Sequence, residues 1–249
     1  MMNTRSLGRI LVPALLATFA SGCIRSESKL VLNADGSAEF EISYSMAEQT
    51  ITQLRAVRKL RDDLRAAAGD TSPDDWQNAF LQAFTDPVEA RVREELAKYE
   101  PYGVTVEKVD IQARNAWRYA LIKVKCSDMA ALGKTHLFKE YGFTLTRNPD
   151  DTYLMARDQN CVEPGVKPDF DDLETARTLG SVLAGFSIGI SVQVPGRIIK
   201  NNASNVSLYS ADWDFDFNRD RNAMTAFQNH KLRLQFQGKG LNLPALKQE

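Results

Sequence analysis

The sequence is poor in the residues that build most metal sites. Its 249 residues include two histidines, His136 and His230, and three cysteines, Cys23, Cys126 and Cys161. No two of these cysteines have the short spacing of a zinc-binding motif. We therefore expect neither a bound metal ion nor another cofactor.

The sequence also lacks an excess of basic charge. Lysine and arginine total 31 and the acidic residues total 32, so the formal net charge at pH 7 is −1. Proteins that bind nucleic acid usually carry a basic patch and a high isoelectric point, so we expect no nucleic-acid partner. With 43% hydrophobic and 25% charged residues, the chain has the composition of a globular protein that can bury a core.

No run of apolar residues at the N-terminus is long enough to span a bilayer, which takes about 20 residues. Arg5 and Arg9 instead precede a short apolar segment, 10–19, which is followed by small residues and Cys23. A positive n-region, a short apolar segment and small residues before a cleavage site are features of a secretory signal peptide. We therefore expect export.

Residues 20–23 (ASGC) resemble the lipobox of bacterial lipoproteins, with Ala20 where leucine is commoner. The resemblance implies that residues 1–22 are removed and that Cys23 is acylated on its sulfur and on its new amine. One acyl chain binds a membrane marginally, whereas two or more give a stable anchor. In Gram-negative lipoproteins an aspartate after the cysteine favours the inner membrane, so Ile24 favours the outer membrane in such a source. An ordinary signal peptide with an incidental cysteine is the alternative.

An exported compartment also permits disulfides. With Cys23 acylated, Cys126 and Cys161 remain. We hypothesise that these two form a disulfide; two unrelated buried thiols are the alternative.

Alternating apolar and polar residues predict strands joined in hairpins. The first hairpin is expected at 29–33 and 38–46, on either side of the turn signal Ala34-Asp35-Gly36. Further strands are expected at 104–114, 117–126, 142–147, 152–157, 188–194, 207–209, 213–217 and 231–237.

Helical periodicity is concentrated in a block at about 47–100, and one further helix is expected at 171–184. Hairpins with interposed helices predict an α+β fold: an antiparallel β-sheet with both helical parts packed on it. We expect a single domain over 29–238, preceded by a lipidated N-terminus and short tether (23–28) and followed by a loose tail (239–249).

The first helix of the block, 47–68, carries five basic residues and is amphipathic. Such a helix can lie on a membrane surface. Because Asp62 and Asp63 partly cancel the charge, we favour a solvated outer face over membrane contact.

Three sequence motifs resemble known functional segments: a nucleophile elbow, a calcium-binding loop and a membrane span. Gly185-Phe186-Ser187-Ile188-Gly189 matches the G-x-S-x-G nucleophile elbow, and Asp214 or Asp216 and then His230 follow in the order of a triad. The elbow needs a strand before the serine and a helix after it. Here helix signals precede Ser187 and a strand follows, so a hydrolase is a minor alternative and we expect no enzyme.

Acidic or amide residues occupy every second position from Asp212 to Asp220, which resembles a calcium loop. The glycine and the final glutamate of such a loop are missing. Trp213, Phe215 and Phe217 fill the alternate positions, so we favour a strand with one aromatic and one acidic face.

The stretch Thr178–Gly196 has no charged residue over 19 positions. Its length is near the lower limit for a membrane span. Because it contains several glycines and serines, we expect a buried helix and strand, with a lipid-touching wall and a true span as alternatives.

Two segments resemble LppM-type bacterial lipoproteins. These are Leu30–Asn33 with the following Asp35-Gly36-Ser37, and Ile190–Gly196 with the following Asn201-Asn202 and Trp213. The resemblance implies an α+β domain outside a bacterial membrane, with lipid or glycolipid binding suggested for some members. It transfers no catalytic residue.

Two functions are therefore expected for a membrane-anchored, non-catalytic binding or scaffolding domain. In the first, the domain holds a lipid or other hydrophobic ligand; in the alternative, it has a filled core and binds a protein of the cell envelope. An exposed apolar patch would favour the alternative. The lining expected for the hydrophobic ligand is Phe186, Ile190, Trp213, Phe215 and Phe217.

Overall fold

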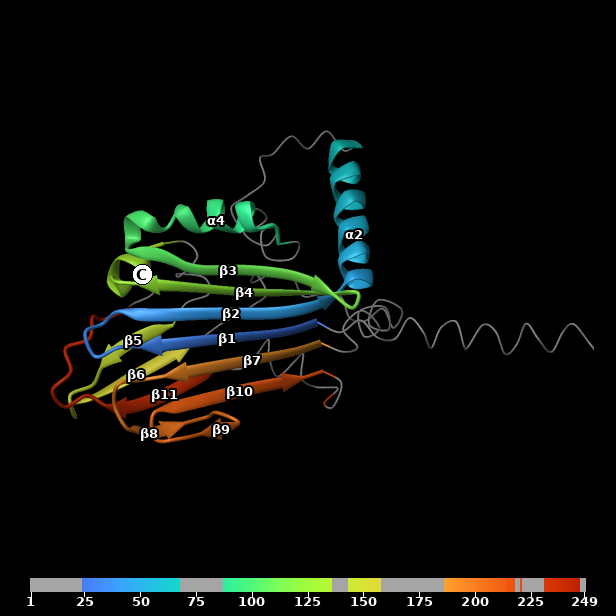
Figure 1. Cartoon of the computed structure of the whole chain (residues 1–249). Coiled ribbons are helices and arrows are strands. Elements are labelled where there is room, and N and C mark those ends of the chain that lie inside the picture. Colours follow the sequence, from blue (N-terminus) through green and yellow to red (C-terminus); the bar gives the residue numbers. More distant parts are fainter. Residues whose placement is uncertain are drawn as a thin grey trace, which may run out of the picture.

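The structure is a computed structural model that describes residues 24–67, 87–135, 143–157, 186–217, 220 and 231–246. These residues form the expected α+β fold, in which most strands pair antiparallel. Figure 1 shows strands stacked in two sheets, with helices at one side and one end. The signal peptide, residues 68–86 of the expected helical block, the helix expected at 171–184, and His136 and His230 lie outside the described residues.

The larger sheet has seven strands in the order β3-β4-β2-β1-β7-β10-β9. Its centre is the first predicted hairpin, in which β1 and β2 pair antiparallel around a turn with Gly36 at φ 85°. β7 adds to β1 in parallel, which is the one parallel pairing among the described strands. The strands are β1 (Ile24–Leu32), β2 (Ala38–Ala47), β3 (Val104–Arg114), β4 (Trp117–Cys126), β7 (Phe186–Gln193), β9 (Asn205–Val206) and β10 (Ser210–Asp216).

A second sheet of four antiparallel strands has the order β5-β6-β11-β8. The strands that the sequence predicts as one sheet are divided into two, because β5, β6, β8 and β11 pair with one another and not with the larger sheet. They are β5 (Thr144–Arg147), β6 (Thr152–Arg157), β8 (Ile198–Asn201) and β11 (Leu232–Gln237).

The main core lies between the facing sides of these two sheets. Val192 and Trp213 of the large sheet and Tyr153, Leu234 and Phe236 of the small sheet are all at most 1% exposed. The rings of Tyr153 and Phe236 stack with centroids 5.6 Å apart. Alternation along each strand sends these side chains inward and their polar neighbours outward.

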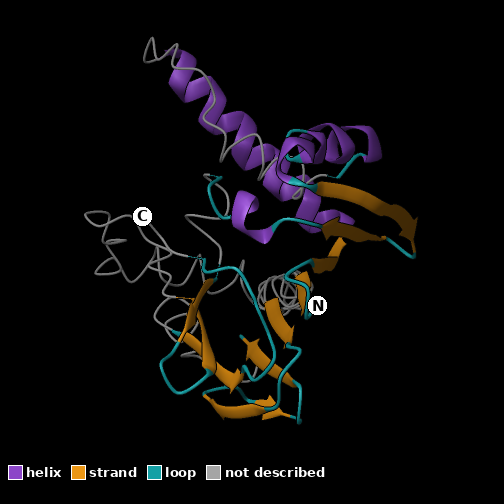
Figure 2. Cartoon of the chain, turned by 90° about the vertical axis from the view of Figure 1, so that its left-hand side faces the viewer, coloured by secondary structure: helices purple, strands orange, loops and turns teal. Residues whose placement is uncertain are grey.

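The helices follow the predicted block. α2 (Glu48–Ala67) continues directly from β2 and runs across the strand direction at the end of the sheet (Figure 1). α4 (Glu89–Ala97) buries Val92 and Leu96 against β3 and β4. The short η1 (Glu100–Tyr102) and α5 (Met129–Leu132) complete the described helices, which gather on the β3–β4 side of the sheets in Figure 2.

Several segments differ from the sequence prediction, and three of them change the description of the fold. Residues 207–209 form a turn, in which the Ser207 hydroxyl accepts the backbone N–H of Ser210 at 3.1 Å. β8 was not predicted, because its four residues have no buried side. The expected tether 23–28 is largely strand, since β1 begins at Ile24.

The segment after β11 was expected to be a loose tail, but it packs against the core as far as Leu246. Leu243 and Leu246 are 6% and 3% exposed. Leu246 and Leu145 exchange two backbone hydrogen bonds of 2.9 Å. This segment therefore extends the core beyond β11.

Candidate functional site

The residues predicted to line a hydrophobic pocket share the inner face of β7 and β10, and three of them are buried in the core. Trp213 is 1% exposed, and Ile190 and Phe215 are each 7% exposed, within the core between the sheets. The Trp213 indole N–H donates to the backbone oxygen and to Oδ1 of Asn202, both at 3.1 Å. These three side chains therefore fill the space that a ligand would need.

Phe186 and Phe217 lie at the end of the large sheet, where β7 begins and β10 ends. Their ring centroids are 5.1 Å apart with the planes tilted by 34°, and both residues are half-buried. The backbone N–H of Phe217 donates to the oxygen of Phe186 at 3.0 Å. This aromatic pair therefore lies at the end of the sheet, where Phe217 packs against the main core.

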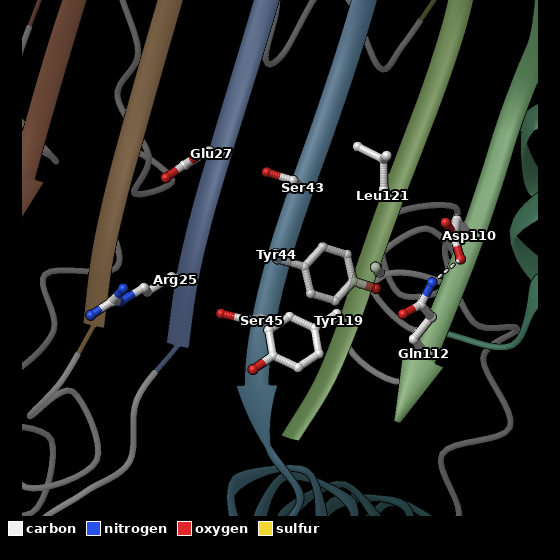
Figure 3. Close-up of a pocket in the computed structure, with 10 residues that line it drawn as sticks. Arg25, Glu27, Ser43, Tyr44, Ser45, Asp110, Gln112, Tyr119 and Leu121 are labelled. Atoms are coloured by element: carbon white, nitrogen blue, oxygen red, sulfur yellow. Dashed lines mark hydrogen bonds between the residues drawn. The ribbon is translucent and has the colours of Figure 1, made fainter. Parts of the chain in front are cut away.

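The outer face of the large sheet carries a polar trough. Two cavities, of about 410 Å³ and 600 Å³, both include Glu27 and Ser43 in their lining and so adjoin each other. Figure 3 looks onto the first cavity. One cross-strand row of the trough follows the register through Asp110, Leu121, Ser43, Glu27, Gly189 and Asp214.

Short side chains form much of the floor of the trough. Ser43, Ser45, Ser187, Gly189 and Ser191 all belong to its lining. A Cβ added at Gly189 would meet its neighbours no closer than 3.6 Å, an ordinary van der Waals contact, so a small side chain would fit there. Hydroxyls and backbone groups of this kind suit a polar chain better than an acyl chain.

One ion pair within β3 and one between β2 and β4 hold charged groups at and beside the trough. The ammonium of Lys108 lies 3.0 Å from Asp110, and the Gln112 amide donates to the same carboxylate at 3.1 Å. These hydrogen bonds, that of Lys108 first, lower the pKa of Asp110. Hydrogen bonding to Glu41 raises the pKa of Lys123 at the other edge of β4. These groups therefore stay charged at neutral pH.

Ser187 does not lie in a nucleophile elbow. It is inside β7, with Arg25 of β1 and Asp216 of β10 as its register partners. The strand–turn–helix geometry that exposes the elbow serine is therefore not formed here. Asp214 accepts a hydrogen bond from the Asn205 amide at 3.3 Å, and His230 lies outside the described residues.

The alternating segment at 212–217 is a strand, as the sequence favours. Asp212, Asp214 and Asp216 point to the outer face, while Trp213 and Phe215 are buried. Over the described part of the chain, no group of three or more metal-ligating side chains comes together.

Cys126 is buried, with its sulfur 4.0 Å from the backbone oxygen of Tyr102. Burial raises the pKa of this thiol, which keeps it protonated and unreactive at neutral pH. Cys161 lies outside the described residues. The Cys126–Cys161 disulfide therefore stays a prediction.

Four exposed apolar side chains lie elsewhere, on β8, on β9 and in the turn between β9 and β10. Ile199, Val206, Leu208 and Tyr209 are 47%, 53%, 57% and 50% exposed. They are four of the six large hydrophobic side chains that are exposed within the described ranges. We call these four residues the apolar corner. Sequence reasoning missed it because its members occupy a turn and two short strands without periodicity.

The described half of the uncharged stretch Thr178–Gly196 is strand β7 and the turn after it. β7 lies inside the large sheet between β1 and β10, and Ile190, Val192 and Val194 are buried. Among the helices of the described residues, none combines the length and apolar character needed to cross a membrane.

Comparisons with known proteins identify no family for this chain. No family model matches it, and no curated protein matches it. Among solved structures, it is similar to the NMR structure of the folded domain of LppM from Mycobacterium tuberculosis. The two share 12% identity and a TM-score of 0.37, over 87% of this chain and 91% of that one. This likeness is weak.

Proposed function

We propose that this chain is an exported, lipid-anchored lipoprotein whose folded domain is a non-catalytic interaction module. The anchor is the acylated Cys23, as the lipobox resemblance implies. The partner is a protein of the cell envelope that covers the apolar corner. The observation that carries the proposal is this exposed corner on a domain whose aromatic strand residues already fill the core.

The filled core favours protein binding over lipid storage. Opening a space for an acyl chain would displace Trp213, whose indole N–H is hydrogen-bonded to Asn202. A buried donor left without its partner costs about 1–3 kcal/mol. The aromatic face therefore stabilises the fold instead of receiving a ligand.

The apolar corner is held in one conformation by backbone hydrogen bonds. The N–H of Ile198 donates to Leu208 at 2.8 Å, and the N–H of Val194 donates to Tyr209 at 2.9 Å. Burying a large apolar side chain contributes about 1.5–3 kcal/mol. A preordered corner keeps more of this free energy on binding, because little conformational entropy is lost.

The test is site-specific photocrosslinking in the native envelope. A benzophenone amino acid replaces Tyr209 of the apolar corner or, as the matched control, Tyr102. Tyr102 is also exposed, at 38%, and lies beside β3, at the opposite edge of the large sheet from β9. We expect a discrete crosslinked protein from position 209 and none from position 102.

Equal labelling from both positions would contradict a specific interface at the apolar corner. Native mass spectrometry of the same preparation separates the two functions. A stoichiometric lipid that co-purifies with the folded protein would overturn the interaction module in favour of a lipid carrier.

A further inference from the structure

We infer that the domain stands upright on the bilayer, with the strand ends around Ile24 resting on anionic lipid headgroups. This inference rests on the proposed lipid anchor at Cys23. Because β1 begins at the next residue, the Cα atoms of Cys23 and Ile24 are about 3.8 Å apart. No tether separates the acylated residue from the sheet.

The register shows which groups share that edge. Ile24 is aligned with Met46 of β2 and with Phe186 of β7. Ala47 is aligned with Trp117, and Trp117 with Arg114. We call Arg114, Trp117, Ala47, Ile24, Phe186 and Phe217 the anchor edge. All six lie at the end of the strands from which α2 departs (Figure 1).

The side chains of the anchor edge are of the kinds found at membrane interfaces. Trp117, Phe186 and Phe217 are partly exposed and not fully buried in the core. Tryptophan at the headgroup level keeps an apolar ring in lipid and a polar N–H in water. Such a row of aromatic side chains suits the boundary between acyl chains and headgroups.

Exposed basic groups accompany these aromatic residues. Arg25 and Arg114 are exposed, and the Arg114 guanidinium lies 4.6 Å from the centre of the Tyr119 ring. The acidic groups nearby are Glu48, which forms an ion pair with Arg118, and Asp216 and Asp220 beside Phe217, at the β10 end. Basic groups near an anionic bilayer each contribute about 1 kcal/mol, so the β3–β4 part of the edge favours such a surface.

The direction of α2 supports the same orientation. The helix begins at Glu48, which pairs with Arg118 at 3.1 Å, and it runs across the strands instead of along them (Figure 1). Figure 2, turned by 90°, shows it extending away to one side of the strands. A bilayer at the anchor edge would therefore lie parallel to the helix. The sequence of α2 holds five basic and three acidic residues.

This orientation determines where the apolar corner and the polar trough lie relative to the membrane. The nine residues of β1 span about 30 Å at 3.3 Å per residue. The apolar corner begins beyond the opposite ends of the strands, since Tyr209 precedes β10. A partner would therefore meet the domain about 30 Å above the headgroups, and the polar trough would open sideways.

The test uses tryptophan quenching in vesicles. The acylated, full mature protein is reconstituted in phosphatidylcholine–phosphatidylglycerol vesicles with or without bromine on the acyl chains. We expect the tryptophan fluorescence of the wild type to be quenched in brominated vesicles. We expect Trp117→Phe to lack the fluorescence that brominated lipid quenches in the wild type. The double variant Trp117→Phe with Tyr209→Trp moves the reporter to the apolar corner, and we expect it to stay unquenched.

The outcomes separate the anchor from the orientation. An acylated, vesicle-bound protein in which Trp117→Phe changes nothing, or in which the reporter at 209 is quenched as strongly, overturns the orientation and leaves the anchor standing. A wild-type protein whose intact mass carries no acyl group overturns both, and a Cys23→Ala protein supplies the reference mass and the unbound control.

Discussion

At residue 196 the chain needs glycine because another part of the backbone comes close. A Cβ there would lie 1.9 Å from the backbone oxygen of Gln237. An unusual backbone conformation is not the reason, because Gly196 is not among the residues with positive φ. The contact joins the end of β7 to β11, and no local pattern announces it.

We therefore expect Gly196→Ala to destabilise the domain. Overpacking costs about 1–3 kcal/mol and sometimes more, and here the obstacle is backbone that cannot rotate away. Urea unfolding of Gly196→Ala should show a loss of at least about 2 kcal/mol. Gly189→Ala is the matched control, since its Cβ would have ordinary contacts at 3.6 Å. Equal stability of the two variants would contradict the close approach of Gly196 to the backbone of Gln237.

At the scale of elements, the local sequence is sufficient to predict where the hairpins form. Alternation and a two-residue turn predict β3 and β4 with the bounds that the structure has. Asn115 and Ala116 in that turn have φ of 53° and 59°, as a type I′ turn requires. Ala116 is an unusual choice, because its Cβ is strained in this region.

The turn between β3 and β4 leads us to predict a substitution that stabilises the domain. Replacing Ala116 with glycine removes the strain, while the Ala116 backbone oxygen still accepts the N–H of Glu48 at 2.9 Å. We expect Ala116→Gly to raise the free energy of unfolding by about 0.5–1 kcal/mol. Ala113→Gly, in the exposed end of β3, should lower it by a similar amount, because glycine weakens a strand interior. Thermal unfolding of both variants measures the difference, and a destabilised Ala116→Gly protein would contradict the turn assignment.

At the scale of the whole molecule, the C-terminal segment closes the core. Leu246 reaches back to pair with Leu145 at the edge of the small sheet and is 3% exposed. From the sequence alone, the segment after β11 is predicted to be a loose tail. Its two buried leucines are three residues apart but lie in neither a helix nor a strand, so their packing could not be predicted from a periodic pattern.

Removing the Leu246 side chain should therefore affect the stability of the entire domain. Leucine-to-alanine changes in a core cost about 2–5 kcal/mol, so Leu246→Ala should shift the urea midpoint clearly downward. Asn242→Ala, at an exposed position of the same segment, should leave it within about 0.5 kcal/mol. A Leu246→Ala protein as stable as the wild type would mean that the segment does not pack as described.

The sequence by itself determined the α+β class, most strand bounds and the outward row of aspartates on β10, because alternation and turn chemistry act between close neighbours. The lipidated Cys23 and the envelope location also come from the sequence and stay proposals. Tertiary structure decided which surfaces are free. The parallel pairing of Ile24 with Phe186, the burial of Trp213 and the exposure of Leu208 depend on segments far apart in the chain, whose contacts leave no local periodicity.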